Sequence, residues 1–230
     1  MTSQPASQPV ARPMFDWLFL LSVAAIAGLL VRILFFTPAE ASQGLAQKIY
    51  YIHVPSAMSA YLALIVAAAM SLVYLWLKDP RADRLAESAT EVAFVFTTGV
   101  LITGPLWGKP IWGTWWTWDA RLSLTLFLWF ITVGYLVLRG AIDDPGMRAR
   151  FSAVLAVLAA LLIPFIHLSV YLFRTLHPMP IVLKPERPSL PREMLITWVL
   201  AVVALLLFCV VLIRARYRLS LLREAAGEDA

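Results

Sequence analysis

The chain contains 230 residues, of which 61% are hydrophobic and 14% are charged, and its mean hydropathy is +0.79. A soluble domain of this length cannot bury so much apolar surface, so the composition excludes a soluble globular protein. The net charge of +5 gives no indication of nucleic-acid binding, because the basic residues follow the pattern of membrane-protein loops. We therefore predict an all-α integral membrane protein that contacts lipid and no nucleic acid.

Six apolar stretches are long enough to span a membrane as helices, since about 20 residues cross a hydrocarbon core of about 30 Å. They cover residues 17–36, 56–77, 87–106, 121–139, 152–173 and 194–213. None shows the alternation of a barrel strand. The prediction is a six-helix transmembrane domain over 17–213, preceded by a disordered polar tail at 1–16 and followed by a basic tail at 214–230.

Lysines and arginines outside these spans predict the orientation of the chain. Eleven of them lie on the side of the two termini and seven on the opposite side. The eleven are Arg12, Lys78, Arg81, Arg84, Arg139, Arg148, Arg150, Arg214, Arg216, Arg218 and Arg223, and the seven are Lys48, Lys109, Arg121, Arg174, Lys184, Arg187 and Arg192. The positive-inside rule then places both termini in the cytoplasm. The segment between the third and fourth spans is external, which for the inner membrane of a bacterium means the periplasmic face.

The segment from Trp107 to Asp119 carries five of the nine tryptophans of the chain. Several indole rings held close together can stack on a large planar aromatic ligand at low entropic cost. Gly108, Pro110 and Gly113 break helices, so we expect this segment to be a loop that lies flat along a surface. A belt of interfacial aromatic residues is the alternative, although such a belt does not need this density. Asp119 is also predicted to cap the fourth helix.

The three histidines fall on the same predicted side as the tryptophan segment. His53 precedes the second span, His177 follows the fifth, and His167 lies within the fifth. Imidazole is a common iron ligand, and haem is the planar cofactor that would combine histidine ligation with an aromatic platform. Ten helical residues rise about 15 Å, so His167 and His177 cannot readily hold one iron if the helix continues between them. We favour His53 and His177 as ligands, and His167 is either a buried, hydrogen-bonded helix residue or part of a deeper site.

Two motifs that would assign other chemistry are absent from the sequence. There is no Cys-x-x-Cys-His, so covalent haem is not predicted, and the single Cys209 cannot form an internal disulfide. Gly104, Gly108 and Lys109 lack Walker-A spacing, so an ATP-driven step would belong to a partner.

The run from Trp112 to Asp119 resembles the WWD signature of haem-handling proteins in cytochrome c biogenesis. With Trp-Gly-Lys-Pro at 107–110 and six spans, the chain is similar to the CcmC family in particular. In this family haem b is held non-covalently against the WWD loop by two external histidines, which correspond to His53 and His177. The residues that the resemblance assigns to haem contact are Trp107, Gly108, Pro110, Trp112, Gly113, Trp115, Trp116, Trp118 and Asp119.

The resemblance implies a scaffold that presents haem at the periplasmic face and is not an enzyme. Haem would pass to the chaperone CcmE, which attaches it covalently through a histidine of its own. The expected partners are CcmA and CcmB, which form an ABC transporter, and the small membrane protein CcmD.

Two other functions are compatible with such a membrane protein. A b-type haem redox protein would pass electrons from quinol, but two bis-histidine haems need four histidines and the sequence has three. A haem-independent transporter would need a polar pathway, for which His167 and Arg32 are the main intramembrane candidates.

Overall fold

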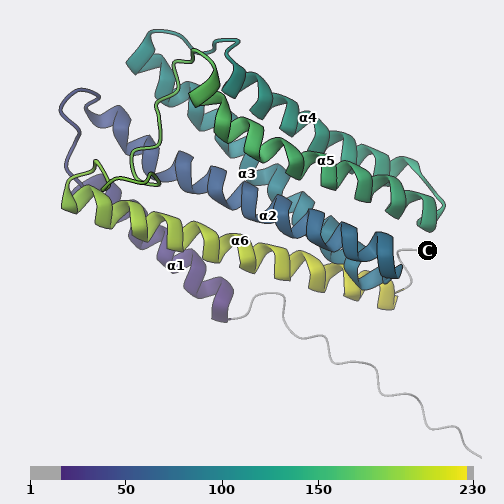
Figure 1. Ribbon diagram of the computed structural model, residues 1–230. Helices are drawn as coiled ribbons and strands as arrows, with labels where there is room; N and C mark the ends of the chain where they lie inside the picture. Colours follow the sequence, from purple (N-terminus) through teal and green to yellow (C-terminus); the bar gives the residue numbers. More distant parts are fainter. Residues whose placement is uncertain (1–16, 227–230) are drawn as a thin grey trace, which may run out of the picture.

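The computed structural model describes residues 17–226, whose long elements are all helices (Figure 1). Six helices are long and apolar enough to cross a membrane, which confirms the predicted all-α membrane fold. The predicted tail at 1–16 lies outside the described residues, as do residues 227–230. The helices are α1 (Trp17–Val31), α2 (Tyr50–Leu77), α3 (Pro80–Trp112), α4 (Ala120–Ala141), α5 (Pro145–Leu172) and α6 (Arg192–Ala226). A π-helical turn, η1 (Arg32–Phe36), follows α1, and a 3-10 turn, η2 (Leu45–Ile49), precedes α2.

Aspartates begin three of the helices. The side chains of Asp79, Asp119 and Asp144 each accept a hydrogen bond from a backbone N–H in the first turn of α3, α4 and α5 respectively. These bonds satisfy donors that a helix leaves unpaired at its start, and the predicted cap at Asp119 is confirmed. Gly113 ends α3 with a φ of 75°, a left-handed conformation that glycine adopts without strain.

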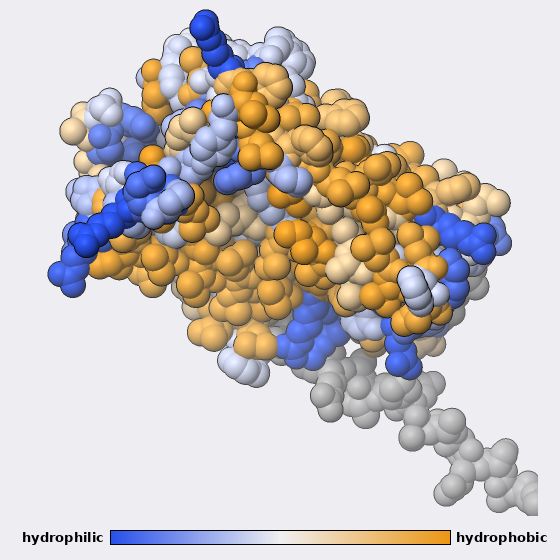
Figure 2. Space-filling model, in the orientation of Figure 1, coloured by the Kyte–Doolittle hydropathy of each residue, from blue (hydrophilic) through white to orange (hydrophobic). Residues whose placement is uncertain are grey.

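Helix α2 lies at the centre of the bundle and packs against α3, α5 and α6, while α4 packs on α5 and α1 on α6 (Figure 1). Alanines that are fully buried occupy many of these contacts, among them Ala63, Ala67, Ala89, Ala93 and Ala201. Small side chains let helices approach closely, which is how helices associate where lipid removes the hydrophobic drive between them. The surface along the bundle is largely apolar, as expected for contact with lipid (Figure 2).

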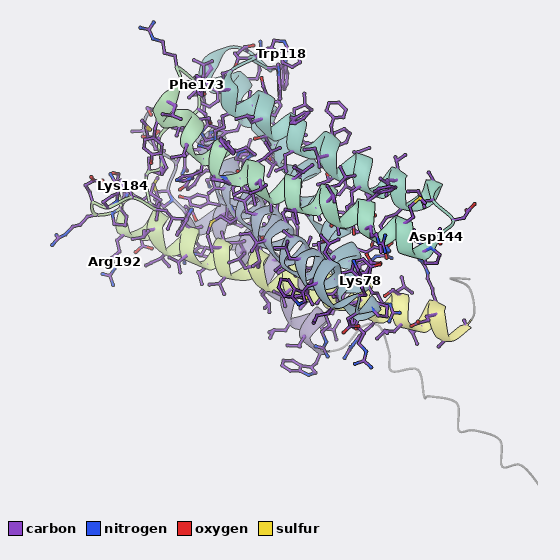
Figure 3. All side chains as sticks on the ribbon, turned by 45° about the vertical axis from the view of Figure 1, so that its right-hand side comes forward. Lys78, Trp118, Asp144, Phe173, Lys184 and Arg192 are labelled. Atoms are coloured by element: carbon purple, nitrogen blue, oxygen red, sulfur yellow. The ribbon has the colours of Figure 1, made fainter. Side chains whose placement is uncertain are left out.

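The two ends of the bundle differ in their connections. At one end short connections next to Lys78 and Asp144 join α2 to α3 and α4 to α5 (Figure 3). The other end carries the longer segments 37–44, 113–119 and 173–191, where Trp118, Phe173 and Lys184 lie (Figure 3). We call this second end the tryptophan end.

Ion pairs connect three helices toward the opposite end. Arg139 of α4 pairs with Asp83 and Glu87 of α3 at N–O distances of 2.8 Å, and Arg216 of α6 pairs with Glu91 of α3. The Arg139 side chain is only 9% exposed. Pairing offsets the cost of removing these charges from water, so α4 and α6 are both fixed against α3.

Helix α3 extends well beyond the predicted span. It runs to Trp112, so the expectation of one flat loop beginning at Trp107 is wrong, and only residues 113–119 are non-helical. Gly108 and Pro110 therefore lie on the helix. A Cβ on Gly108 would lie 3.0 Å from the ring of Trp112, so the glycine serves close packing of that ring and does not break the helix.

Two further boundaries differ from the prediction. Helix α2 begins at Tyr50, which places His53 in its first turn and not before the span. Helix α6 continues to Ala226, so the described part of the basic segment after residue 213 prolongs the helix. The ion pair between Arg216 and Glu91 gives this extension a contact with α3.

Candidate functional site

A cavity of about 350 Å³ lies at the tryptophan end, between α2, α3, α4, α5, α6 and the segments that connect them. All three histidines of the chain line it. The other predicted site residues in its wall are Trp107, Gly108, Trp112, Trp115, Trp116 and Asp119. The structure thus brings eight of the eleven predicted site residues together, counting these six with His53 and His177. Pro110, Gly113 and Trp118 do not line the cavity within the described residues.

His53 is held in one tautomer by a contact between α2 and α3. Its Nδ1 lies 2.9 Å from the hydroxyl of Thr103, and that hydroxyl donates its own hydrogen to the carbonyl of Gly99 at 2.7 Å. A hydroxyl has one hydrogen, so Thr103 accepts from His53, and Nδ1 carries the proton. The lone pair of His53 is therefore on Nε2. A Cβ on Gly104 would lie 3.3 Å from the imidazole, so glycine there makes room for the ring.

His177 has the same tautomer for a different reason. Its Nδ1 lies 3.1 Å from the carbonyl oxygen of Pro178, which can only accept a hydrogen bond, so Nδ1 carries the proton. Burial, together with the nearby charge of Arg121, lowers the pKa of His177 to about 4. The ring is therefore neutral at physiological pH, and its Nε2 also has a free lone pair.

Asp119 links the loop at 113–119 to the segment that carries His177. One carboxylate oxygen accepts from the backbone N–H of Leu122, and the other accepts from the hydroxyls of Thr117 at 3.2 Å and Thr175 at 2.8 Å. The Thr175 hydroxyl in turn accepts from the backbone N–H of His177 at 3.0 Å. The sequence predicted the helix cap, and the structure adds this second role in positioning His177.

The tryptophans do not form the single flat platform that we expected. The rings of Trp107 and Trp112 are inclined by 41°, and those of Trp116 and Trp118 by 77°. The physical reason is that the first two belong to α3 and the last two to the following loop. Trp107 is only 5% exposed and donates to Gln43 at 3.1 Å, with its ring centroid 5.8 Å from that of His53.

The outer tryptophans differ sharply from the inner ones in their exposure. Trp118 is 78% exposed and Trp115 is 55% exposed, with the ammonium group of Lys109 6.0 Å from the Trp115 ring centroid. Trp116 is partly buried, and its ring N–H has no hydrogen-bond partner among the described residues. Trp118 therefore faces outward, whereas Trp115 both lines the cavity and is exposed.

Arg121 is a cavity residue that the sequence analysis used only for charge counting. It lies in the first turn of α4, and its buried Nη1 has no hydrogen-bond partner within residues 17–226. The neighbouring Asp119 does not neutralise it through a hydrogen bond, because the oxygens of that carboxylate bind Leu122, Thr117 and Thr175. A buried guanidinium nitrogen without a hydrogen-bond partner is costly, which favours an anionic group on a ligand of this cavity. The signal in the sequence was a basic residue at the apolar start of a span, two positions after Asp119.

His167 lies on α5 and is exposed, so the expectation of a buried, hydrogen-bonded histidine is wrong. Within residues 17–226 no group of three or more His, Cys, Asp or Glu side chains is placed to hold a metal ion. The groups in the cavity wall that suit a metal and an anion are therefore the imidazoles and the guanidinium of Arg121, set among apolar and aromatic side chains. This set suits a metal that brings further ligands and a negative charge with it.

Comparison with known proteins identifies the family of the chain. The family model of heme exporter protein C, CcmC, matches residues 1–230. The chain is 36% identical to heme exporter protein C of Haemophilus influenzae over 219 residues, which cover 93% of this chain and 86% of that protein. It is 38% identical to the protein of the same name from Bradyrhizobium diazoefficiens over 191 residues, which cover 81% of this chain and 71% of that protein. The resemblance found in the WWD signature is confirmed, and the chain belongs to the CcmC family.

Proposed function

We propose that this chain binds haem b non-covalently in the cavity at the tryptophan end, with Nε2 of His53 and Nε2 of His177 as the two axial ligands of the iron. The observation that carries the proposal is the shared tautomer of these residues. Each imidazole donates its Nδ1–H to a protein oxygen and leaves Nε2 free in the wall of one cavity. Histidines that bind metals in proteins have this arrangement, in which the second ring nitrogen is fixed by a hydrogen bond.

The remaining wall fits the rest of the haem molecule. The macrocycle is apolar and aromatic, and the wall supplies Trp107, Trp112 and Trp116 beside it. The two propionates of haem are carboxylates, which could accept from the Nη1 of Arg121 that has no hydrogen-bond partner among the described residues. Two imidazoles would occupy both axial positions of the iron, so the site holds haem and leaves no position for oxygen or substrate. We infer a scaffold for haem delivery and not an enzyme.

The delivery role requires an exposed face for a partner. We propose that the tryptophan end faces the periplasm from the inner membrane of a bacterium, and that the chaperone CcmE docks over the exposed loop at 113–119 to receive haem. The exposure of Trp118 favours contact with the partner over contact with haem. An ATP-driven step belongs to CcmA and CcmB, and CcmD completes the complex. The names of the relatives, heme exporter protein C, support this assignment.

The two alternative functions have less support from the site. The sequence has three histidines and all of them line one cavity, whereas electron transfer by two bis-histidine haems needs four. Arg32, one of the polar residues considered for a transport pathway, is engaged by Thr197 at 3.0 Å and Glu193 at 3.4 Å. Haem delivery, unlike these two alternatives, gives a role to the histidines, the tryptophans and Arg121 of the cavity.

Replacing Thr103 with valine tests the role of the tautomer. The variant keeps the shape of the side chain but removes the acceptor for His53 Nδ1–H, and loss of such a supporting bond weakens metal binding by about 10–100-fold. We expect a haem titration followed by absorbance to show this loss of affinity. Thr97→Val is the control, because Thr97 lines the same cavity but bonds only to the carbonyl of Ala93. Equal haem affinity in the two variants would contradict the assignment of His53.

Replacing Arg121 with glutamine tests the contact with propionate. Hydrogen bonds to charged groups contribute about 1.5–3 kcal/mol, so we expect the variant to bind haem at least about tenfold more weakly. The dimethyl ester of haem has no carboxylates, and its affinity should change little. Arg174→Gln, which alters an exposed cation at the same end, serves as the control. If the variant loses affinity for haem and for its ester equally, Arg121 does not bind the propionates.

Replacing Trp118 with alanine tests the docking face. The side chain is 78% exposed and lies outside the cavity wall, so the spectrum of bound haem should not change. Tryptophans at the centre of an interface contribute about 2 kcal/mol or more, and we expect the soluble domain of CcmE to bind at least about tenfold more weakly to the protein in nanodiscs. Trp76→Ala changes an equally exposed tryptophan at the opposite end and is the control. Undiminished binding by the Trp118 variant would exclude this residue from the interface.

A further inference from the structure

His167 is the histidine that the proposed iron ligation does not use. It lies on α5, five residues before the last residue of the helix, Leu172, which places it about 7.5 Å deeper along the helix axis. Its side chain nevertheless lines the same cavity as His53 and His177. The cavity therefore continues from the tryptophan end into the part of the bundle that crosses the membrane.

The surface of α5 next to His167 is apolar and faces outward. Side chains that recur every three or four residues and are 47% to 69% exposed form a stripe there, namely Leu161, Phe165, Leu168 and Leu172. In a helix that spans a membrane such a stripe contacts lipid. At 3.6 residues per turn His167 lies about 100° around the helix from Leu168. It shares its face of α5 with Tyr171, which is 51% exposed and whose ring lies 6.1 Å from that of the histidine.

His167 thus lies where the cavity meets the lipid-facing surface. Within residues 17–226 its ring makes no hydrogen bond or ion pair. An ionisable side chain at membrane depth is costly, and one that lines a cavity indicates a ligand. The wall of the cavity also contains Met58, Tyr61 and Trp198, which add apolar and aromatic surface.

We infer that His167 stands at a lateral entrance of the cavity, where its imidazole ligates the iron of a haem that arrives from the lipid before the haem moves inward to His53 and His177. The inference rests on the proposed function of the cavity. Haem suits this route, because its macrocycle is apolar and partitions into lipid while its two carboxylates remain at the surface.

The transfer step is an exchange of iron ligands. The bond between iron and His167 Nε2 breaks, and a bond between iron and the Nε2 of an inner histidine forms. The oxidation state of the iron does not change, because one imidazole nitrogen replaces another and no electron is transferred. Arg121, at the inner side, attracts the propionates and favours inward movement.

Uptake of haem from lipid tests this entrance. The full-length protein in nanodiscs is mixed with phosphatidylcholine vesicles that contain haem, and the rise of the low-spin absorbance is followed in time. We expect His167→Leu to slow this rise about tenfold, which corresponds to about 1.4 kcal/mol. The final spectrum should be that of the wild type, because His53 and His177 are present. Tyr171→Phe is the control and should load at the wild-type rate.

Comparing His167→Met with His167→Leu shows whether the side chain at 167 acts as an iron ligand or only through its size. Methionine and leucine are similar in size, but only the thioether of methionine ligates haem iron. His167→Met should therefore load faster than His167→Leu. Equal slowing in these two variants would overturn the ligand role, and loading of His167→Leu at the wild-type rate would overturn the entrance itself.

Supplying haem from water instead of lipid distinguishes a lateral entrance from an effect on the whole site. When haem is supplied from water as its complex with albumin, His167→Leu should load as fast as the wild type, since this route does not pass the lipid-facing surface. Slowing of that route to the same extent would overturn the lateral position. A wild-type protein that forms no low-spin haem complex would contradict the proposed function and this inference together, whereas the other outcomes leave the proposed function intact.

Discussion

The hydrogen bond from His53 to Thr103 is the constraint on which the site depends. The Thr103 hydroxyl gives its hydrogen to the carbonyl of Gly99, one helical turn earlier, and so can only accept from the imidazole. The carbonyl of Pro178 imposes the same tautomer on His177. Two rings that carry their proton on Nδ1 and leave Nε2 free in one cavity have the arrangement that the proposed ligation of haem iron requires. In the proposed function, the aromatic wall and the guanidinium of Arg121 would favour a flat, anionic ligand.

The bundle brings these groups together through contacts between segments far apart in the sequence. Glycine at 104 lets α3 approach the ring of His53, and the carboxylate of Asp119 joins the loop at 113–119 to the segment of His177 through Thr175. Away from the site, the ion pairs of Arg139 and Arg216 fix α4 and α6 to α3. The helices can therefore present a cavity with a largely apolar wall at one end. Many of their other contacts are made by buried alanines.

The sequence predicted the fold well because apolar length alone identifies membrane-spanning helices. It also predicted that the histidines and the tryptophan segment meet, since the topology places them at one end. It did not predict that α3 continues through Gly108 and Pro110, because that depends on how the ring of Trp112 packs on the glycine. The roles of Thr103 and Arg121 were equally hidden. The first depends on a contact between residues fifty positions apart. The second depends on Asp119 accepting from Leu122, Thr117 and Thr175 and not from Arg121.

The most direct test of the central claim is pulsed electron paramagnetic resonance of the ferric, haem-loaded protein in which histidine alone carries nitrogen-15. The account predicts a low-spin haem with hyperfine coupling to two histidine nitrogens, one of which is lost in His53→Ala and the other in His177→Ala. A wild-type signal from a single histidine nitrogen, or two that persist in both variants, would contradict it.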